Sequence, residues 1–271
     1  MNAFTPFQLL LFHRDIAFSK TALDQGIDGL IVDFENKGKT ARQVGFDTEI
    51  NFHTLNDLDA VRTLSDAHIL CRINGSENRS DQETSDVLNA GADEIIVPMI
   101  RSLDEAKAVL DAVTGAARIT LMVETSQALG IVTQLCTLPV DRIYVGLNDL
   151  MISRGSATIF EPLIDGTLDE IRADIADANG VQFGFGGLTL RGQGDPLPVQ
   201  YLTDELARNR ADFTFLRRSF YRDLGDQTVG DVLCQMRTDI AAARARDATQ
   251  SRIAFDNLKA AVCEMGAVHS A

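Results

Sequence analysis

Short apolar runs alternate along the chain with longer stretches in which hydrophobic residues recur at helical spacing. Eight such runs stand out, at residues 8–12, 29–35, 68–74, 94–100, 119–125, 142–149, 181–188 and 213–220. Most of them are nearly continuous in apolar residues, as is typical of parallel strands that are buried on both faces. The pattern therefore predicts eight strands of a parallel sheet.

Helical patterns occupy the stretches between these runs, among them residues 54–64, 81–89 and 102–114. The third begins with Ser102 and has Glu105 three positions later, the pattern of a capping box. Gly26 and Gly91 each stand between a predicted helix and the next strand, where glycine commonly ends a helix in the left-handed conformation. Alternating strands and helices predict an α/β fold, a single (β/α)8 TIM barrel that takes in residues 1–271. An open doubly wound sheet is the alternative.

The chain continues well beyond the eighth predicted strand. Residues 223–247 and 251–265 both have helical patterns, and Ile253, Leu258, Ala261 and Val262 are predicted to lie on one side of the second helix. We therefore expect a C-terminal helical extension at about residues 223–271. Such an additional helix would cap the barrel or pack on a neighbouring subunit, and a homo-oligomer is expected.

Composition and charge exclude several classes of partner. The formal net charge is −14, with 39 acidic and 25 basic residues, so the chain repels phosphate backbones and nucleic acid is not an expected partner. The longest apolar runs are far too short to cross a membrane, and the N-terminus lacks the features of a secretion signal. The four cysteines show no metal-binding spacing. We expect a soluble, cytoplasmic protein whose partner is a small molecule.

Reactive side chains stand near the ends of several predicted strands, and the carboxyl ends of the strands are where a (β/α)8 barrel carries its chemistry. Glu124 and Asp149 end the fifth and sixth runs, and two carboxylates from adjacent strands suit Mg²⁺ or Mn²⁺. Arg72, at the end of the third run, would face them and could stabilise an enolate oxygen. The remaining polar strand-end residues are His13, Asp33, Glu35, Asn74, Arg217 and Arg218.

These strand ends resemble the HpcH/HpaI aldolase and citrate lyase family, which belongs to the phosphoenolpyruvate/pyruvate-binding barrels. The matching segments are residues 32–35, 71–74, 91–98, 122–125 and 145–150, in order and at the expected barrel positions. The resemblance covers the chain from about the first strand through the sixth. It implies a metal-dependent carbon–carbon lyase that acts on a 2-oxo acid through a pyruvate-type enolate.

The resemblance also implies roles for individual residues. Glu124 and Asp149 would be the metal ligands, and Arg72 would bind the oxo acid and stabilise its enolate. Backbone N–H groups around Gly146 and Asn148 would hold the substrate carboxylate. Members of the family often form oligomers by exchanging C-terminal helices, which fits the extension predicted here.

The sequence departs from the family in two places. Asn36 stands where the oxo-acid branch has a histidine base and the citrate lyase branch has aspartate. A base must then come from elsewhere, with His13 and His53 as candidates by position, or be a metal-bound water; Glu35 is a further candidate for a catalytic role. The second departure comprises the glycines of residues 184–187 and the pair Arg217 and Arg218. Of this pair at most one is expected to face the barrel, and Arg217 is the predicted substrate-binding residue, for a phosphate or a second carboxylate.

Two other functions stay open at this point. An acyl-CoA lyase of the citrate lyase type would need basic groups near the barrel mouth, and only Lys37, Lys39 and Arg42 lie close after the second strand. A non-catalytic ligand-binding barrel is the other alternative, and the missing histidine is its main support.

Overall fold

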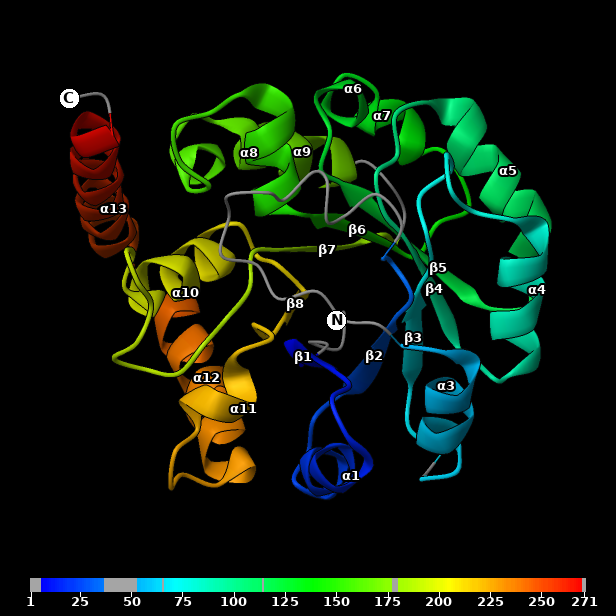
Figure 1. The fold of residues 1–271 in the computed structure, drawn as a ribbon. Coiled ribbons are helices and arrows are strands. Elements are labelled where there is room, and N and C mark those ends of the chain that lie inside the picture. Colours follow the sequence, from blue (N-terminus) through cyan, green and yellow to red (C-terminus); the bar gives the residue numbers. More distant parts are fainter. Residues whose placement is uncertain (1–5, 37–52, 65, 114, 177–179, 270–271) are drawn as a thin grey trace.

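A computed structural model describes residues 6–36, 53–64, 66–113, 115–176 and 180–269 of the chain. Its centre is a closed barrel in which eight parallel strands follow one another in sequence order (Figure 1). Strand β1 pairs with both β2 and β8, so the sheet has no open edge. The predicted (β/α)8 barrel is confirmed, and the doubly wound alternative is wrong.

The strands start where the apolar runs start, to within one residue. They are β1 (Gln8–Phe12), β2 (Gly29–Asp33), β3 (Ile69–Arg72), β4 (Glu94–Val97), β5 (Arg118–Val123), β6 (Arg142–Val145), β7 (Gln182–Phe185) and β8 (Phe213–Phe215). Seven of the eight end earlier than predicted, because apolar residues just after the strands are buried as well. Phe34, Ile73, Ile100 and Leu188 are examples of this burial beyond a strand end.

Helices surround the barrel. They are α1 (Ile16–Asp24), α3 (Leu55–Arg62), α4 (Asp81–Asn89), α5 (Leu103–Val113), α6 (Ser126–Leu129), α7 (Val132–Leu135), α8 (Leu147–Arg154), α9 (Thr167–Ala176), α10 (Val199–Arg208), α11 (Phe220–Asp223), α12 (Val229–Arg244) and α13 (Ala248–His269), with a short 3-10 helix at Glu161–Leu163. Gly26 and Gly91 have φ angles of 95° and 90°, as the predicted left-handed helix ends require. At the start of α5, Ser102 Oγ accepts a hydrogen bond from Glu105 N (3.2 Å), while the Glu105 carboxylate accepts one from Arg101 N (2.8 Å).

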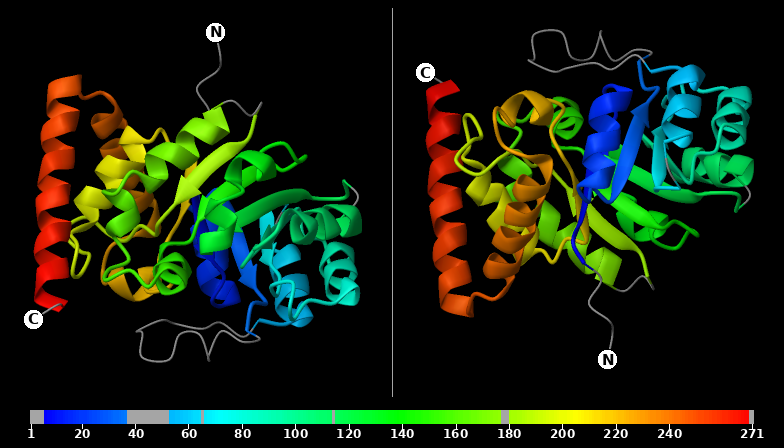
Figure 2. Two further views of the ribbon diagram at one scale, coloured as in Figure 1. Left: turned by 90° about the horizontal axis from the view of Figure 1, so that it is seen from above. Right: turned by 90° about the horizontal axis from the view of Figure 1, so that it is seen from below.

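The C-terminal extension is helical, as predicted, but it is divided into α11, α12 and α13. Helix α13 runs along the outside of the molecule and packs on α10 (Figure 2). Leu258 and Val262 of this helix are buried, whereas Ile253 is 53% exposed. The prediction that Ile253 shares the buried side is wrong, because five residues of helix turn it well away from Leu258. No helix in the described part of the chain is long and apolar enough to cross a membrane.

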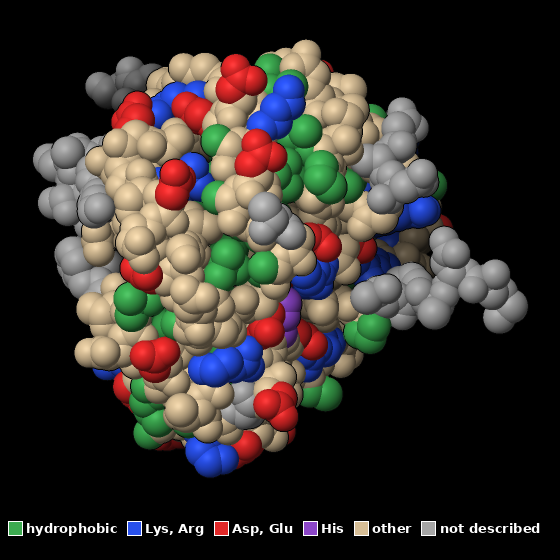
Figure 3. Space-filling model, turned by 90° about the vertical axis from the view of Figure 1, so that its right-hand side faces the viewer, with side chains coloured by type: hydrophobic (Ala, Val, Ile, Leu, Met, Phe, Trp, Pro, Cys, Tyr) green, Lys and Arg blue, Asp and Glu red, His purple; other side chains and the backbone are tan. Residues whose placement is uncertain are grey.

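The strands separate two apolar regions. One lies between the sheet and the surrounding helices and is the larger core. The other is a layer inside the barrel, made of Leu10, Ile31, Leu70, Ile96, Met122, Tyr144, Phe213 and Phe215. Figure 3 shows the face that carries α3, α4 and α5, where acidic and basic side chains are scattered rather than gathered in one patch.

Candidate active site at the carboxyl ends of the strands

The structure brings most of the predicted site residues to the carboxyl end of the barrel. Asp33 ends β2, Arg72 ends β3, and Glu124 follows β5 directly; all three side chains are buried. Asp149 is buried too, but it does not end a strand as predicted. Strand β6 stops at Val145, Gly146 caps the next helix, and Asp149 lies in the first turn of α8. The apolar run continues through Leu147 without a break, which is why the sequence pattern extended the strand too far.

Arg72 is held in one orientation by two carboxylates. Its Nε and Nη2 donate to the two oxygens of Asp33, at 2.8 and 2.7 Å, and its Nη1 lies 3.3 Å from Glu35 Oε2. Burial alone would lower the pKa of this guanidinium, but Asp33 and Glu35 more than offset that effect and raise it. Nη1 also lies 4.0 Å from the sulfur of Met122 on β5, so this nitrogen points across the barrel toward the strand that carries Glu124. Arg72 is thus a fixed, permanently charged donor.

A second guanidinium, that of Arg218, lies at the same carboxylate. Its Nη2 donates to Asp33 Oδ2 at 3.1 Å. The ring of Phe12 is shared by both arginines, with the Cζ atoms of Arg72 and Arg218 at 5.3 and 4.8 Å from the ring centroid. Burial and the charge of Arg72 lower the pKa of Arg218, while Asp33 and Glu35 oppose this. The mouth of the barrel therefore holds two arginines side by side.

Glu124 is fixed from two neighbouring strands. Its Oε1 accepts a hydrogen bond of 2.8 Å from the backbone N–H of Met99, a residue that follows β4. Met99 has a φ of 57°, which is uncommon for a residue other than glycine and is found mainly at turns and functional sites. On the other side, a Cβ atom at position 146 would collide with Glu124 Oε2, so glycine there leaves room for the carboxylate in this position. Neither Met99 nor this use of Gly146 was predicted, because backbone angles and close approaches leave no simple signal in one sequence.

The carboxylates of this cluster repel one another. Burial, together with the charges of Asp149 and Glu35, raises the pKa of Glu124 to about 8, while Arg72 and the Met99 amide oppose the shift. Asp33 and Glu35 act on both Arg72 and Arg218, and Glu124 acts on Arg72, while Asp149 adds its charge beside Glu124. Among the described residues, no three His, Cys, Asp or Glu side chains form a group that could hold a metal ion.

The two candidate histidines form a pair beside the site. Their ring centroids are 5.2 Å apart; His13 Nδ1 lies 2.7 Å from Ser19 Oγ, and His53 Nδ1 accepts a hydrogen bond of 2.8 Å from Asp33 N. Burial, and then the neighbouring ring, lower the pKa of His13 to about 4; burial also lowers that of His53. Both rings are therefore neutral at pH 7, and His53 carries its proton on Nε2.

Several of the predicted site residues lie away from the centre of the site. Arg217 donates from Nε to the carbonyl of Gly187 at 3.3 Å, while its neighbour Arg218 turns to Asp33. Asn148 lies in the first turn of α8 and is exposed. A Cβ at Gly184 would collide with the carbonyl of Phe213, so this glycine serves close packing of β7 on β8. The basic residues Lys37, Lys39 and Arg42 lie outside the described residues.

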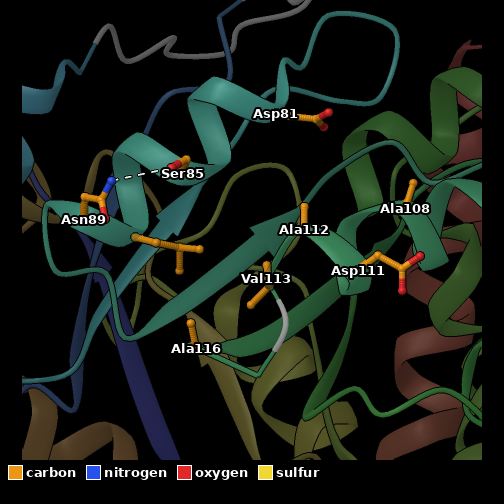
Figure 4. A pocket seen from close by; sticks show the side chains of 9 residues that line it. Asp81, Ser85, Asn89, Ala108, Asp111, Ala112, Val113 and Ala116 are labelled. Carbon is orange, nitrogen blue, oxygen red and sulfur yellow. Dashed lines mark hydrogen bonds between the residues drawn. The ribbon is translucent and has the colours of Figure 1, made fainter.

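A groove of about 490 Å³ lies elsewhere, between α4 and α5 on the outer wall (Figure 4). Small and polar side chains line it, and Asn89 Nδ2 donates to Ser85 Oγ within it at 3.5 Å. None of the residues that line the groove belongs to the strand-end cluster, so the groove is separate from the candidate active site. The lining residues are Asp81, Ser85, Leu88, Asn89, Ala108, Asp111, Ala112, Val113 and Ala116.

Comparison with known proteins places the fold. No protein-family model and no curated protein sequence matches this chain. Among solved structures, an HpcH/HpaI aldolase/citrate lyase family protein from Burkholderia cenocepacia superposes with a TM-score of 0.60 at 15% identity, over 90% of this chain and 96% of the other. An HpcH/HpaI aldolase from Desulfitobacterium hafniense gives 0.60 at 13% identity, over 90% and 95%.

Tryptophan synthase from M. tuberculosis is similar as well, with a TM-score of 0.57 at 14% identity, over 88% of this chain and 93% of the other. Likeness at such identities therefore shows a shared fold and leaves the reaction to be argued from the site. The (β/α)8 barrel of this chain is thus the barrel seen in two HpcH/HpaI proteins, the family that its strand-end motifs resemble.

Proposed function

We propose that this chain is a carbon–carbon lyase, an aldolase that acts on a 2-oxo acid through a pyruvate-type enolate and depends on a divalent metal ion. The observation that carries the proposal is the convergence of Glu124 and Asp149 with the fixed Arg72 at the barrel mouth. The strand-end motifs and the likeness to two HpcH/HpaI structures support the same reaction class.

The donor set fits a divalent metal ion. Glu124 and Asp149 supply carboxylate oxygens, which Mg²⁺ and Mn²⁺ prefer, and substrate and water oxygens would complete the coordination. A cation bound there would also favour the ionised form of Glu124, whose pKa is raised by burial and by the charges of Asp149 and Glu35. Bound there, such an ion would polarise the carbonyl of the oxo acid.

Arg72 contributes binding and charge stabilisation in this proposal. Because Asp33 fixes its plane through two hydrogen bonds, its Nη1 stays directed toward β5 without reorganisation during the reaction. Nη1 would donate to the oxygen on which enolate charge develops. We propose Glu35 and His13 as candidates for proton transfer. Gly146 and Asn148, at the start of α8, would bind the substrate carboxylate through their backbone N–H groups.

Proton exchange on the methyl group of pyruvate tests the function directly. In deuterated buffer the protein should exchange these protons, lose the activity on thorough treatment with EDTA, and regain it with Mg²⁺ or Mn²⁺. Glu124→Ala and Arg72→Met should each lower the rate by about 100-fold or more. The control Glu264→Ala, on the exposed surface of α13, should leave it unchanged. Full exchange after metal removal would refute metal dependence, and no exchange under any condition would refute the aldolase.

A further inference from the structure

His53 binds the backbone of Asp33 at the end of β2. The last residue pair between β1 and β2 joins Phe12 and Ile31, after which the chain leaves β1 for α1. Beside Asp33 the neighbour of β2 is His53, whose backbone N–H donates to the carbonyl of Asp33 at 3.4 Å. Its Nδ1 accepts a shorter hydrogen bond, of 2.8 Å, from the N–H of Asp33. One residue thus binds both backbone groups of Asp33.

The position of His53 is set by contacts with α3 and α1. It directly precedes Thr54, the N-cap of α3, whose N–H and hydroxyl donate to the carboxylate of Asp57 at 2.7 and 2.8 Å. The ring of His53 also lies against that of His13, with centroids 5.2 Å apart, and His13 Nδ1 lies 2.7 Å from Ser19 Oγ on α1. These contacts hold the imidazole beside the end of β2.

The contact between His53 and Asp33 extends to Arg72. The carboxylate of Asp33 fixes the guanidinium plane of Arg72 through hydrogen bonds of 2.8 and 2.7 Å. Asp33 is fully buried, and its Oδ1 also accepts a hydrogen bond of 3.3 Å from the N–H of Glu35. Because the carboxylate is bound so closely, a movement of the Asp33 backbone displaces the guanidinium as well. The direction of Arg72 therefore depends on what holds Asp33.

Only the neutral imidazole of His53 can make this contact. Nδ1 accepts the hydrogen bond with its lone pair, so the ring carries its one proton on Nε2. Protonation places a second proton on Nδ1, opposite the N–H of Asp33, and two donors cannot bond to each other. The charged ring would also attract the Asp33 carboxylate and so compete with Arg72 for it.

The groups that face His53 determine when it becomes charged. Burial has the largest effect and lowers the pKa of His53 below the ordinary value of 6.5; Asp33 and Asp57 oppose this shift, and Arg218 adds to it. Burial and then the charge of His53 lower the pKa of His13 to about 4. His53 therefore takes up a proton before His13 does as the pH falls.

We propose that His53 is a positioning residue, which as a neutral acceptor holds Asp33 and, through Asp33, holds Arg72 in the direction that the reaction needs. This inference rests on the proposed aldolase. It gives His53 a role other than that of the base, since Nε2 carries a proton and Nδ1 is engaged by the Asp33 N–H. When acid turns His53 from an acceptor into a donor, Arg72 loses its fixed direction and the activity falls.

Asparagine and leucine at position 53 test the role of the acceptor, because their side chains share one branched shape. The asparagine oxygen can take the place of Nδ1 and does not titrate, whereas leucine puts a methyl group there. With the full-length, metal-loaded protein at neutral pH, His53→Asn should keep most of the wild-type rate of pyruvate proton exchange. His53→Leu should lower that rate by about 10-fold, because it removes the acceptor of a buried N–H.

The pH profile of the exchange rate separates positioning from structural support. The wild-type rate should fall below pH 6.5 as His53 is protonated, and in His53→Asn this loss should move to lower pH. Asn56→Leu makes the same exchange of amide for apolar side chain at an exposed position of α3 and should match the wild-type profile. An identical acid limb in the wild-type protein and His53→Asn, or equal losses in the two position-53 variants at neutral pH, would overturn the inference.

NMR provides a measurement that does not depend on activity. The amide resonance of Asp33 should shift with the same midpoint as the ring of His53, and this shift should vanish in His53→Asn. An Asp33 amide that does not follow the ring would overturn the role of His53 while leaving the aldolase intact. No proton exchange in the wild-type protein at any pH would refute the aldolase, and the role of His53 in it. Circular dichroism shows whether His53→Leu is folded; if it is not, the wild-type protein and His53→Asn decide.

Discussion

Buried arginines lie at both ends of the barrel, and their surroundings differ. At the amino end Arg142 is fully buried; it pairs with Glu94 (3.1 Å) and donates to the side chains of Gln182 (2.7 Å) and Gln8 (2.6 Å). Glu94 is bonded in turn by His68 and Thr120. Here the guanidinium of Arg142 pairs directly with one carboxylate, and uncharged amide and hydroxyl side chains accept or donate further hydrogen bonds.

At the carboxyl end, by contrast, Asp33 and Glu35 act on two guanidinium groups, and Glu124 lies beside both Arg72 and Asp149. Burial and the neighbouring carboxylates raise the pKa of Glu124 to about 8. Paired and hydrogen-bonded charges are typical of a structural cluster. A strongly shifted pKa in a group of like charges is more typical of a functional site. We therefore interpret Arg142 as a structural arginine, whereas Arg72 has the surroundings expected for the proposed function, although both are buried.

The largest effect is expected at the amino end. Arg142→Met leaves Glu94 buried without its cation, and breaking a buried ion pair in this way should lower the free energy of unfolding by about 3–5 kcal/mol. Urea denaturation measures the loss. Arg191→Met removes an exposed cation from its pair with Asp239; it is the control and should cost far less, because exposed ion pairs contribute little to stability. A loss no larger than that of the control would contradict a structural role for Arg142.

A smaller effect is expected from His13 as the pH falls. Its pKa is about 6.5 in the unfolded chain and about 4 in the folded protein, so between these values the unfolded state binds the proton more readily. Stability should then rise with pH from about 4 to about 6.5, by up to about 3 kcal/mol from this residue. His13→Gln should flatten the stability profile in that window, as urea titrations at several pH values would reveal. An unchanged slope would mean that folding does not lower the pKa of His13.

The smallest effect concerns the backbone of Met99. At a φ of 57° glycine is unstrained and alanine is not, and both substitutions remove the same packing of the methionine side chain beyond Cβ. Met99→Gly should therefore be more stable than Met99→Ala by about 1 kcal/mol, measured by thermal unfolding. If alanine is the more stable of the two, the left-handed conformation of residue 99 is wrong.

The sequence predicts the features that local patterns determine, such as strand positions, better than those that depend on contacts between distant residues. Strand starts follow from buried apolar runs, and Asp33, Arg72 and Glu124 come together because parallel strands end at one rim. Alternation of faces indicated that only one of Arg217 and Arg218 would turn inward, but it did not say which. Strand β8 ends at Phe215, before either residue, so the alternation of a strand no longer fixes their directions.

Other features depend on contacts between distant segments. The amide of Met99 reaches Glu124 from a neighbouring strand, and Gly146 has to be small because of the same carboxylate. The place of Asp149 in a helix follows from a turn at Gly146 that the apolar pattern passes over. Such features are set by three-dimensional packing, which no spacing rule along one chain records.

The apolar layer inside the barrel has a consequence for redesign. Eight side chains, Leu10, Ile31, Leu70, Ile96, Met122, Tyr144, Phe213 and Phe215, form a plug of hydrocarbon and aromatic rings between the two charged ends. This layer separates the two clusters: Arg142 pairs with Glu94 at the amino end, and Arg72 pairs with Asp33 at the carboxyl end. Residues at the mouth could therefore be exchanged to introduce a new chemistry, while the ion pair and hydrogen bonds of the amino-end cluster stay unchanged.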